Sequence, residues 1–332
     1  MQFDQLKRRQ FIALLGGAAV AWPLSSRAQQ AGKVWRIGFL SALSREAYSR
    51  LDARFQEGMR ELGYVEGKDF VTEWRSVEGN YERFPELADE LTRLKVDVIV
   101  TGVTAALPAL KRATTTIPIV MAYSIDPVGI GVVASLARPG GNITGLASSS
   151  DDSSPKQLEL LAAVVPNASR IGFLGNPNSP SYSSVLKTAQ SAAKRGGLSL
   201  LPIGARSLQE IEDAFVALAR ERVPAAMFVG DAVLYQQQHR IAELALANRV
   251  ATMFSQREYV VAGGLMSYGE DVAEFYHRAP FFIDKIFKGA KPGDLPIEQP
   301  TKFNLVINLK TAKALGLTIS RDFLLIADEV IE

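Results

Sequence analysis

Cysteine is absent from all 332 residues of the chain. Its absence excludes disulfide bonds, thiolate nucleophiles and metal sites built on cysteine ligands. It also excludes the lipidated cysteine that tethers many exported proteins of bacteria with a single membrane. If the chain is exported, it therefore has neither covalent cross-links nor a lipid anchor on cysteine.

Catalytic and cofactor motifs are also missing. Only His239 and His277 occur, far apart and without the spacing of a zinc site, so each is expected on a solvated or packed helix face. No G-x-G-x-x-G follows the first predicted strand, no G-x-x-x-x-G-K-[ST] occurs, and Ser267 has the wrong spacing for a G-x-S-x-G elbow. We predict a protein that is not an enzyme, with no catalytic residue, no metal and no cofactor.

A strong charge of either sign is lacking as well. The formal net charge is +2, and the lysines and arginines are scattered apart from a cluster near the N-terminus. Nucleic acid as a partner is therefore excluded. The chain is 47% hydrophobic and 22% charged, without a long linker or low-complexity tract, which is typical of about two well-buried domains.

The five residues R-I-G-F-L occur twice, at Arg36–Leu40 and at Arg170–Leu174. Each copy ends a short apolar run and opens a stretch in which helical and strand patterns alternate. The repeat predicts two similar α/β lobes in tandem, with a ligand cleft between them. The alternative is coincidence, because R-I-G-F-L is also an ordinary sequence for a buried strand.

The alternation can be followed through both halves of the chain. Helices are expected at residues 48–62, 81–94, from 104, 181–195, 208–220, 235–248 and 275–288. Strands are expected at residues 70–74, 96–100, 117–121, 198–203, 225–229 and 250–254, and residues 303–332 should add a strand and a helix. Short apolar runs between helices indicate parallel sheets covered on both faces, so we predict two doubly wound, Rossmann-like lobes.

Residues 1–28 have the features of an export signal. Lys7-Arg8-Arg9 precedes the apolar run 11–22, and Ser26 and Ala28 form an A-x-A-like cleavage site. The paired arginines followed by x-Phe-Ile are typical of the twin-arginine route, with the general secretory route as the alternative. A membrane anchor is a further alternative, but the apolar run is short for a bilayer.

This signal also predicts where the protein works. We expect passage through the export machinery and cleavage after about Ala28. An exported protein without an anchor is retained near the cell only by a second membrane. We therefore predict a soluble protein in the periplasm of a Gram-negative bacterium.

Polar residues follow the predicted strands at their carboxyl ends, where open α/β sheets bind ligands. In the first half these are Ser41, Thr101, Gly102, Thr104, Tyr123 and Ser124. In the second half they are Asn176, Ser181, Tyr182, Asp231 and Ser255. Because such residues recur at the same strand ends in both halves, we predict that they line one ligand site.

The residue types predict how a small solute is held. Thr104, Ser124 and Ser181 would lie near helix N-termini, where free backbone N–H groups and the helix dipole favour a carboxylate or a similar anion. Asp231 would meet an ammonium group, and Tyr48, Tyr123, Tyr182 or Tyr235 would flank an aromatic body. The alternative is that the polar residues are N-caps or turns, as in Asp126-Pro127 before an expected helix, and that the tyrosines are packing residues.

Two segments carry a family resemblance. D-P-V-G at 126–129 and S-L-A-R-P-G-G-N-I-T-G at 135–145 resemble the signature of a family of ABC-transporter substrate-binding proteins that includes tryptophan-binding members. The likeness covers essentially the whole chain after the signal, including Gly230-Asp231, Tyr268-Gly269, T-K-F-N-L-V-I-N at 301–308 and K-T-A-K-A-L-G-L at 310–317.

The resemblance implies a type I periplasmic-binding-protein fold, in which three segments cross between two lobes and the ligand is closed between them. It implies lobe 1 at 34–143 plus about 269–298, and lobe 2 at 144–268 plus about 301–332. Pocket residues implied by the resemblance are Thr101, Thr104, Ser124, Asp231 and Ser255, and we add Tyr268. The hinge is expected at Gly140, Gly141, Gly145 and Gly269, with plain loop punctuation as the alternative.

The expected function follows from these features together. We expect the solute-binding component of an ABC importer, which carries an amino acid or a small aromatic or carboxylate compound to a membrane permease with its ATPase subunits. A sensor of the same fold that presents its closed form to a membrane kinase is one alternative. An exported enzyme is another, because the twin-arginine route often carries folded cofactor proteins.

Overall fold

The two R-I-G-F-L segments form equivalent strands. In the computed structural model, which describes residues 33–148, 150–166, 168–300 and 302–332, β1 (Trp35–Ser41) and β6 (Arg170–Gly175) each lie second from one edge of a sheet. The first sheet has the order β2-β1-β3-β4-β5, and the second has the order β7-β6-β8-β9-β10 followed by β11 and β12. The shared order confirms two lobes of similar topology, both within residues 35–332.

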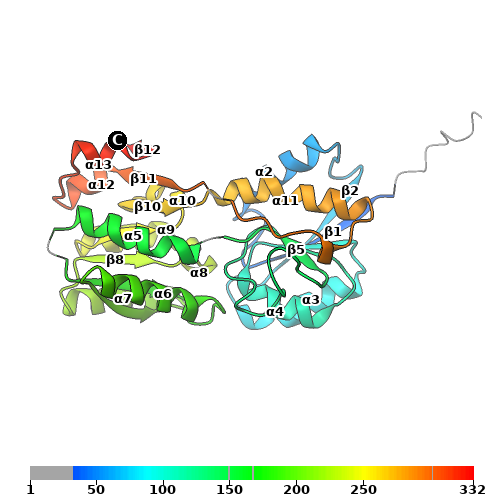
Figure 1. Cartoon of the computed structure of the whole chain (residues 1–332), viewed down its shortest axis with the longest axis horizontal. Coiled ribbons are helices and arrows are strands. Elements are labelled where there is room, and N and C mark those ends of the chain that lie inside the picture. Colours follow the sequence, from blue (N-terminus) through cyan, green and yellow to red (C-terminus); the bar gives the residue numbers. More distant parts are fainter. Residues whose placement is uncertain (1–32, 149, 167, 301) are drawn as a thin grey trace, which may run out of the picture. The chain divides into compact units, whose positions relative to one another are not determined.

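The first lobe is a five-stranded parallel sheet with helices on both faces (Figure 1). Its other strands are β2 (Phe70–Ser76), β3 (Val98–Thr101), β4 (Ile119–Met121) and β5 (Ile143–Gly145). Its helices are α2 (Ser49–Glu61), α3 (Phe84–Arg93), α4 (Leu107–Ala113) and α11 (Val272–Phe287), with the short 3₁₀ turns η2 (Tyr81–Arg83), η3 (Thr104–Ala106) and η4 (Pro292–Asp294).

The apolar pattern explains this arrangement. All four residues of β3 are buried, as expected for a central parallel strand covered on both faces. In α3 the buried residues Phe84, Leu87, Ala88 and Leu91 recur at the spacing of one helix face. Although α11 comes late in the sequence, it packs on α2 and contributes to the core of the first lobe.

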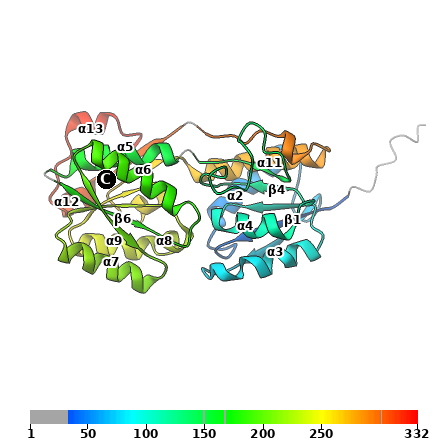
Figure 2. The ribbon, with the colours of Figure 1, turned by 60° about the horizontal axis from the view of Figure 1, so that its bottom comes forward.

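The second lobe has seven strands and the larger set of helices (Figure 2). Its other strands are β7 (Ser199–Gly204), β8 (Ala225–Phe228), β9 (Ala251–Phe254), β10 (Met266–Gly269), β11 (Asn304–Asn308) and β12 (Glu329–Ile331). Its helices are α5 (Ser150–Val164), α6 (Tyr182–Arg195), α7 (Leu208–Arg220), α8 (Ala232–Gln236), α9 (Gln238–Ala247), α10 (Arg257–Val261), α12 (Leu309–Ala314) and α13 (Arg321–Leu325). Figure 2 shows α5 and α6 on one side of the sheet and α7 and α9 on the other.

Three features of the fold differ from the sequence expectation. β11 runs antiparallel to β10, because it follows a segment that crosses between the lobes rather than a crossover helix. α5 was not predicted, since its amphipathic pattern is weak and Pro155 lies inside it. No helix follows Asp126; its carboxylate Oδ1 instead accepts the N–H of Gly129 at 2.8 Å in a turn.

Three segments of the chain connect the lobes. The first follows β5, the second lies between β10 and α11, and the third precedes β11. The first and third run side by side, since Ala147 N–H donates to the Glu298 carbonyl at 2.9 Å and Glu298 N–H donates to the Gly145 carbonyl at 3.0 Å. The first and second are tied by the Ser148 hydroxyl, which donates to the buried Glu270 carboxylate.

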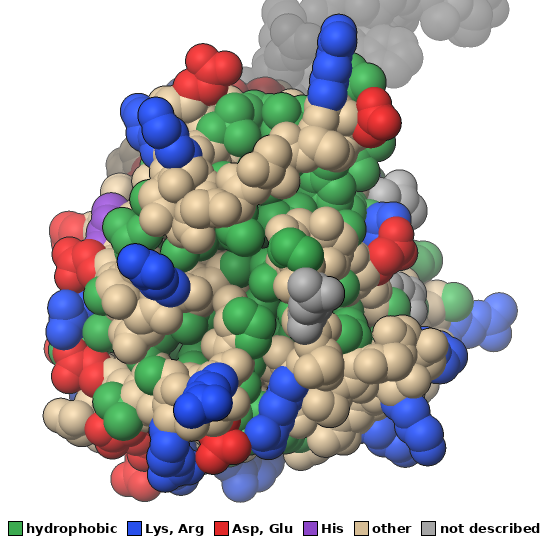
Figure 3. All heavy atoms as spheres, turned by 90° about the vertical axis from the view of Figure 1, so that its left-hand side faces the viewer, with side chains coloured by type: hydrophobic (Ala, Val, Ile, Leu, Met, Phe, Trp, Pro, Cys, Tyr) green, Lys and Arg blue, Asp and Glu red, His purple; other side chains and the backbone are tan. Residues whose placement is uncertain are grey.

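Charged residues of both signs are mixed on the surface. Figure 3 shows the face of the second lobe that carries α12 and α13, where Lys, Arg, Asp and Glu side chains lie around hydrophobic ones. This face carries no field of one sign, in keeping with the net charge of +2.

Candidate ligand-binding site

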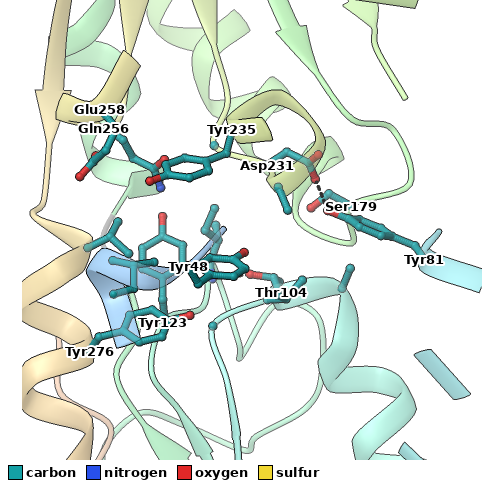
Figure 4. Close-up of a pocket in the computed structure, with 18 residues that line it drawn as sticks. Tyr48, Tyr81, Thr104, Tyr123, Ser179, Asp231, Tyr235, Gln256, Glu258 and Tyr276 are labelled. Atoms are coloured by element: carbon teal, nitrogen blue, oxygen red, sulfur yellow. Dashed lines mark hydrogen bonds between the residues drawn. The ribbon is translucent and has the colours of Figure 1, made fainter. Parts of the chain in front are cut away.

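A pocket of about 700 Å³ lies where the carboxyl ends of the strands of both lobes meet (Figure 4). This is the expected place for a ligand in open α/β sheets. The first lobe contributes Tyr48, Leu51, Tyr81, Gly102, Val103, Thr104, Ala105, Tyr123, Val272 and Tyr276. The second lobe contributes Ser179, Gly230, Asp231, Ala232, Tyr235, Gln256 and Glu258, and Ile125 completes the lining.

Tyrosine rings form much of the wall. Tyr48, just before α2, and Tyr235, on α8, face each other from the two lobes with ring centroids 6.5 Å apart and planes inclined by only 8°. Tyr276 of α11 lies 6.5 Å from Tyr48 with its plane inclined by 22°. Tyr123 is held edge-on against Phe275 at 5.4 Å. The pocket thus offers several aromatic faces to a flat or cationic ligand.

Asp231 is the acidic centre of the pocket. Its side chain caps α8 by accepting the N–H of Val233 at 2.9 Å, which fixes the carboxylate in place. The same carboxylate accepts the hydroxyl of Tyr81 at 3.1 Å and the amide of Asn176 at 3.3 Å. Burial raises the pKa of Asp231, and these three hydrogen bonds oppose the rise.

Four tyrosine hydroxyls of the pocket are neutral at physiological pH. Burial is the largest cause that raises the pKa of Tyr48, Tyr81, Tyr235 and Tyr276 above the ordinary value for tyrosine. The nearby charge of Asp231 raises the pKa of Tyr48 and Tyr81 further. These groups therefore act as hydrogen-bond donors and aromatic surfaces, not as anions.

An ion pair joins the lobes at the edge of the pocket. Arg50 of α2 in the first lobe pairs with Glu258 of α10 in the second. Arg50 also lies 3.8 Å from the carboxylate of Asp271, which caps α11. The charge of Glu258 is thereby compensated inside the protein.

Four of the residues predicted for the site line this pocket: Gly102, Thr104, Tyr123 and Asp231. Tyr48 and Tyr235, named as possible flanks of an aromatic ligand, line it too. Gly102 is required by close packing, because a Cβ there would lie 2.1 Å from the hydroxyl oxygen of Tyr276.

The other predicted residues of the first lobe make internal contacts instead. The Ser41 hydroxyl accepts the N–H of Leu43 at 3.3 Å, and the Thr101 hydroxyl accepts the N–H of Val103 at 3.2 Å. Ser124 is fully buried, and its hydroxyl has no hydrogen-bond partner among the described residues. These residues turn or support the chain behind the pocket and do not line it.

In the second lobe, Asn176 acts on the pocket indirectly by holding Asp231. Ser181 and Tyr182 lie outside the lining at the start of α6, where the Ser181 hydroxyl is 3.2 Å from that of Ser179. Tyr182 packs edge-on against Phe173 at 5.8 Å.

Ser255 and Tyr268 also lie outside the main pocket. Ser255 lines a smaller pocket of about 300 Å³, which shares Tyr123, Ile125 and Gly230 with the main one. Tyr268 stacks on Phe303 at 5.4 Å and does not belong to the lining.

The four glycines expected at the hinge occupy two kinds of position. Gly145 and Gly269 end β5 and β10, directly before two of the connecting segments. Gly140 and Gly141 precede β5 at its other end, and the N–H of Gly140 donates to Gly293 at 3.3 Å. Gly140 and Gly141 therefore lie within the first lobe, because the chain passes through β5 after them and before it leaves that lobe.

Sequence reasoning missed Tyr81, Tyr276, Gln256 and Glu258. Tyr81 begins η2, between β2 and α3, so the strand-end rule would have found it had that strand been included. Tyr276 lies on α11, which returns to the first lobe from far along the chain, and no local signal marks it.

One group of possible metal ligands occurs among the described residues. Carboxylates of Glu57 and Glu61 on α2 lie near His277 of α11, outside the pocket. His277 Nε2 is 3.1 Å from the Glu61 carboxylate, and Arg54 pairs with Glu57. The group is therefore read as side chains packed between two helices, with Glu57 paired to Arg54.

Comparison with known proteins points to one family. The family model for "ABC transporter substrate binding protein" matches residues 36–331. A "Tyrosine-binding protein" of Clostridioides difficile is 24% identical over 281 residues, which cover 85% of this chain and 81% of that protein. No helix in the described part of the chain has the length and apolar character needed to cross a membrane.

Solved structures agree in fold. An ABC domain in complex with L-Trp from Streptococcus pneumonia is 26% identical, with a TM-score of 0.83, and the match covers 90% of this chain and 100% of that one. A conserved domain protein of Vibrio cholerae has the same identity and coverage, with a TM-score of 0.84. With the family match over residues 36–331, these results show that the chain belongs to the ABC transporter substrate-binding protein family and has the type I periplasmic-binding-protein fold.

Proposed function

We propose that this protein is the extracytoplasmic solute-binding component of an ABC importer and that it binds an aromatic amino acid between its two lobes. The observation that carries this proposal is the placement of two near-parallel tyrosine rings beside one carboxylate in a single pocket. Tyr48, Tyr235 and Asp231 provide these groups.

The geometry of the rings favours an aromatic side chain. A ring held between two others needs a centroid separation of about 7 Å, twice the usual contact distance between carbon atoms. Tyr48 and Tyr235 are 6.5 Å apart and nearly parallel, so a slight opening of the lobes admits a flat ring between them. Aromatic pairs of this kind stabilise a complex beyond the area that they bury.

Asp231 supplies the partner for the ammonium group of an amino acid. Its carboxylate is half-buried at the pocket wall and accepts only neutral donors, of which Tyr81 comes from the opposite lobe. A ligand ammonium would form a charge-assisted hydrogen bond with this carboxylate. Thr104, Ser179 and Gln256 are neutral polar groups within the lining that would meet the remaining polar atoms.

Closure of the lobes would couple binding to transport. Contacts between the lobes at the pocket, from Tyr81 to Asp231 and from Arg50 to Glu258, belong to a closed arrangement. A ligand that touches both lobes binds the closed form more tightly than an open one and therefore shifts the population towards it. The closed form would then dock on a membrane permease whose ATPase subunits drive import.

The relatives support an amino acid of this class. One is named as a tyrosine-binding protein, and one solved structure holds L-Trp. The export signal predicted at residues 1–28 lies outside the described residues and agrees with a site of action in the periplasm.

Calorimetric titration of the purified protein tests this proposal. We expect saturable binding of L-tryptophan, L-tyrosine or L-phenylalanine, and no binding of L-leucine, L-glutamate or L-arginine at the same concentrations. A ligand at about 100 times its Kd should add about 2.7 kcal/mol to the free energy of unfolding, which a thermal melt detects. If no aromatic amino acid binds, the proposed function is wrong.

A further inference from the structure

The charges around the pocket are unequal. Its eighteen described lining residues include two carboxylates, those of Asp231 and Glu258, and no Lys, Arg or His. Arg50 compensates Glu258 from outside the lining. Asp231 has only neutral partners among the described residues, namely Tyr81, Asn176 and the N–H of Val233. The pocket therefore carries one uncompensated negative charge at its wall.

The aromatic walls add to this preference. The facing rings of Tyr48 and Tyr235 present the negative side of the ring quadrupole, which attracts an ammonium group and repels a carboxylate. The hydroxyls of Tyr48, Tyr81, Tyr235 and Tyr276 stay protonated, because burial raises their pKa. The walls therefore favour a positive ligand without themselves becoming charged.

A ligand carboxylate has a weaker set of partners. Thr104, Ser179 and Gln256 offer a carboxylate only neutral donors, and no Lys, Arg or His occurs in the described lining. Hydrogen bonds from neutral donors recover only part of the hydration free energy that a carboxylate loses on burial. The amine is therefore the recognised end of the ligand, and the carboxylate contributes little to affinity.

We propose that the pocket selects ligands by their positive charge, so that an arylalkylammonium without a carboxylate binds at least as tightly as the matching amino acid, whereas an aromatic anion is rejected. This inference rests on the proposed function, because it concerns the same pocket, and it names the ligand class more narrowly. Asp231 binds the positive charge of the ligand, and Tyr48 and Tyr235 pack against its aromatic ring.

Three indole ligands of similar size test the inference, since they differ mainly in charge. Tryptamine is a cation, L-tryptophan a zwitterion and indole-3-propionate an anion at pH 7. We expect the Kd of tryptamine to equal or lie below that of L-tryptophan, and indole-3-propionate to bind about 100-fold more weakly than tryptamine.

Asp231→Asn is the matching variant. Asparagine also caps a helix well, so α8 and the fold should be retained, which a thermal melt verifies. We expect tryptamine to bind this variant at least roughly tenfold more weakly, since a charge-assisted hydrogen bond is lost, while indole-3-propionate does not weaken. Asp213→Asn removes the same charge from the exposed face of α7 and should leave all three affinities unchanged.

The pH dependence gives a second readout. Asp231 is faced by Asn176 and by the hydroxyls of Tyr48, Tyr81 and Tyr259, and burial raises its pKa. A cation prefers the ionised carboxylate, so its affinity is full above that pKa and falls about tenfold per pH unit below it. Between pH 8 and 4 we expect the Kd of tryptamine to rise in the unmodified protein and to stay constant in Asp231→Asn. A constant Kd in the unmodified protein would contradict the inference.

The outcomes of the ligand series separate the two proposals. If L-tryptophan binds and tryptamine binds at least tenfold more weakly, the charge inference is overturned while the proposed function stands. If L-tryptophan, L-tyrosine, L-phenylalanine and tryptamine all fail to bind, both are overturned. If indole-3-propionate binds as tightly as tryptamine, the inference that Asp231 selects ligands by their positive charge is wrong.

Discussion

Gly145→Ala should lower the free energy of unfolding by roughly 4 kcal/mol, the sum of backbone strain and overpacking. Gly145 has a φ of 126°, a region that L side chains rarely adopt. A Cβ there would lie 2.2 Å from the Met121 carbonyl oxygen and 2.6 Å from its nitrogen, inside the paired strands β4 and β5. Backbone atoms cannot move aside as a flexible side chain can, so β5 must shift and the first connecting segment with it.

Thermal or chemical unfolding measures this change, and Gly141→Ala is the matched control. Gly141 precedes β5 at its other end, has no positive φ, and a Cβ there would meet nothing within 4 Å. We expect the control to change the free energy of unfolding by no more than about 0.5 kcal/mol. Equal stability of the two variants would show that the strands at Gly145 are not packed as described.

Tyr235→Ala should weaken the binding of an aromatic ligand by about 100-fold. The substitution removes one of the two rings that would hold the ligand, together with the apolar area that this ring buries against it. Tyr235 is the only ring of the second lobe in the described lining, whereas Tyr48 is backed by Tyr276 and Trp74 of the first. Its loss therefore leaves no second ring to replace it on that side. Calorimetric titration with the tightest aromatic ligand measures the effect.

Tyr235→Phe is the control for this variant. It keeps the ring and removes the hydroxyl, so we expect the Kd to stay within about threefold of the unmodified value. Tyr235 is only partly buried, and its replacement should leave the fold intact. An affinity of Tyr235→Ala within threefold of the unmodified protein would mean that the ligand ring does not lie against α8.

Much of the fold could be predicted because its signals are local. The apolar runs of β1, β3, β6 and β8 are nearly continuous, and helices such as α7 repeat apolar residues at helical spacing. The repeated R-I-G-F-L then identified equivalent strands in the two lobes. The features that could not be predicted depend on distant parts of the chain. The antiparallel direction of β11 is one of them, because β11 enters its sheet from the third connecting segment.

The candidate site was predictable only where a residue both follows a strand and points into the pocket. Thr104 and Asp231 meet both conditions. Ser41 and Thr101 meet only the first, because their hydroxyls bond to nearby N–H groups, as the alternative of turn residues anticipated. Tyr276 meets only the second, since α11 reaches the pocket after a crossing between lobes that no local pattern reveals.

The location of a bound aromatic ligand tests the central claim most directly. A crystal structure with 5-bromo-L-tryptophan, in which anomalous scattering places the bromine, would fix both the position and the orientation of the ligand. We predict that the indole ring lies between Tyr48 and Tyr235 and that the ammonium nitrogen lies about 2.8 Å from the Asp231 carboxylate. A ring outside the pocket between the lobes, or an ammonium group turned away from Asp231, would contradict the account.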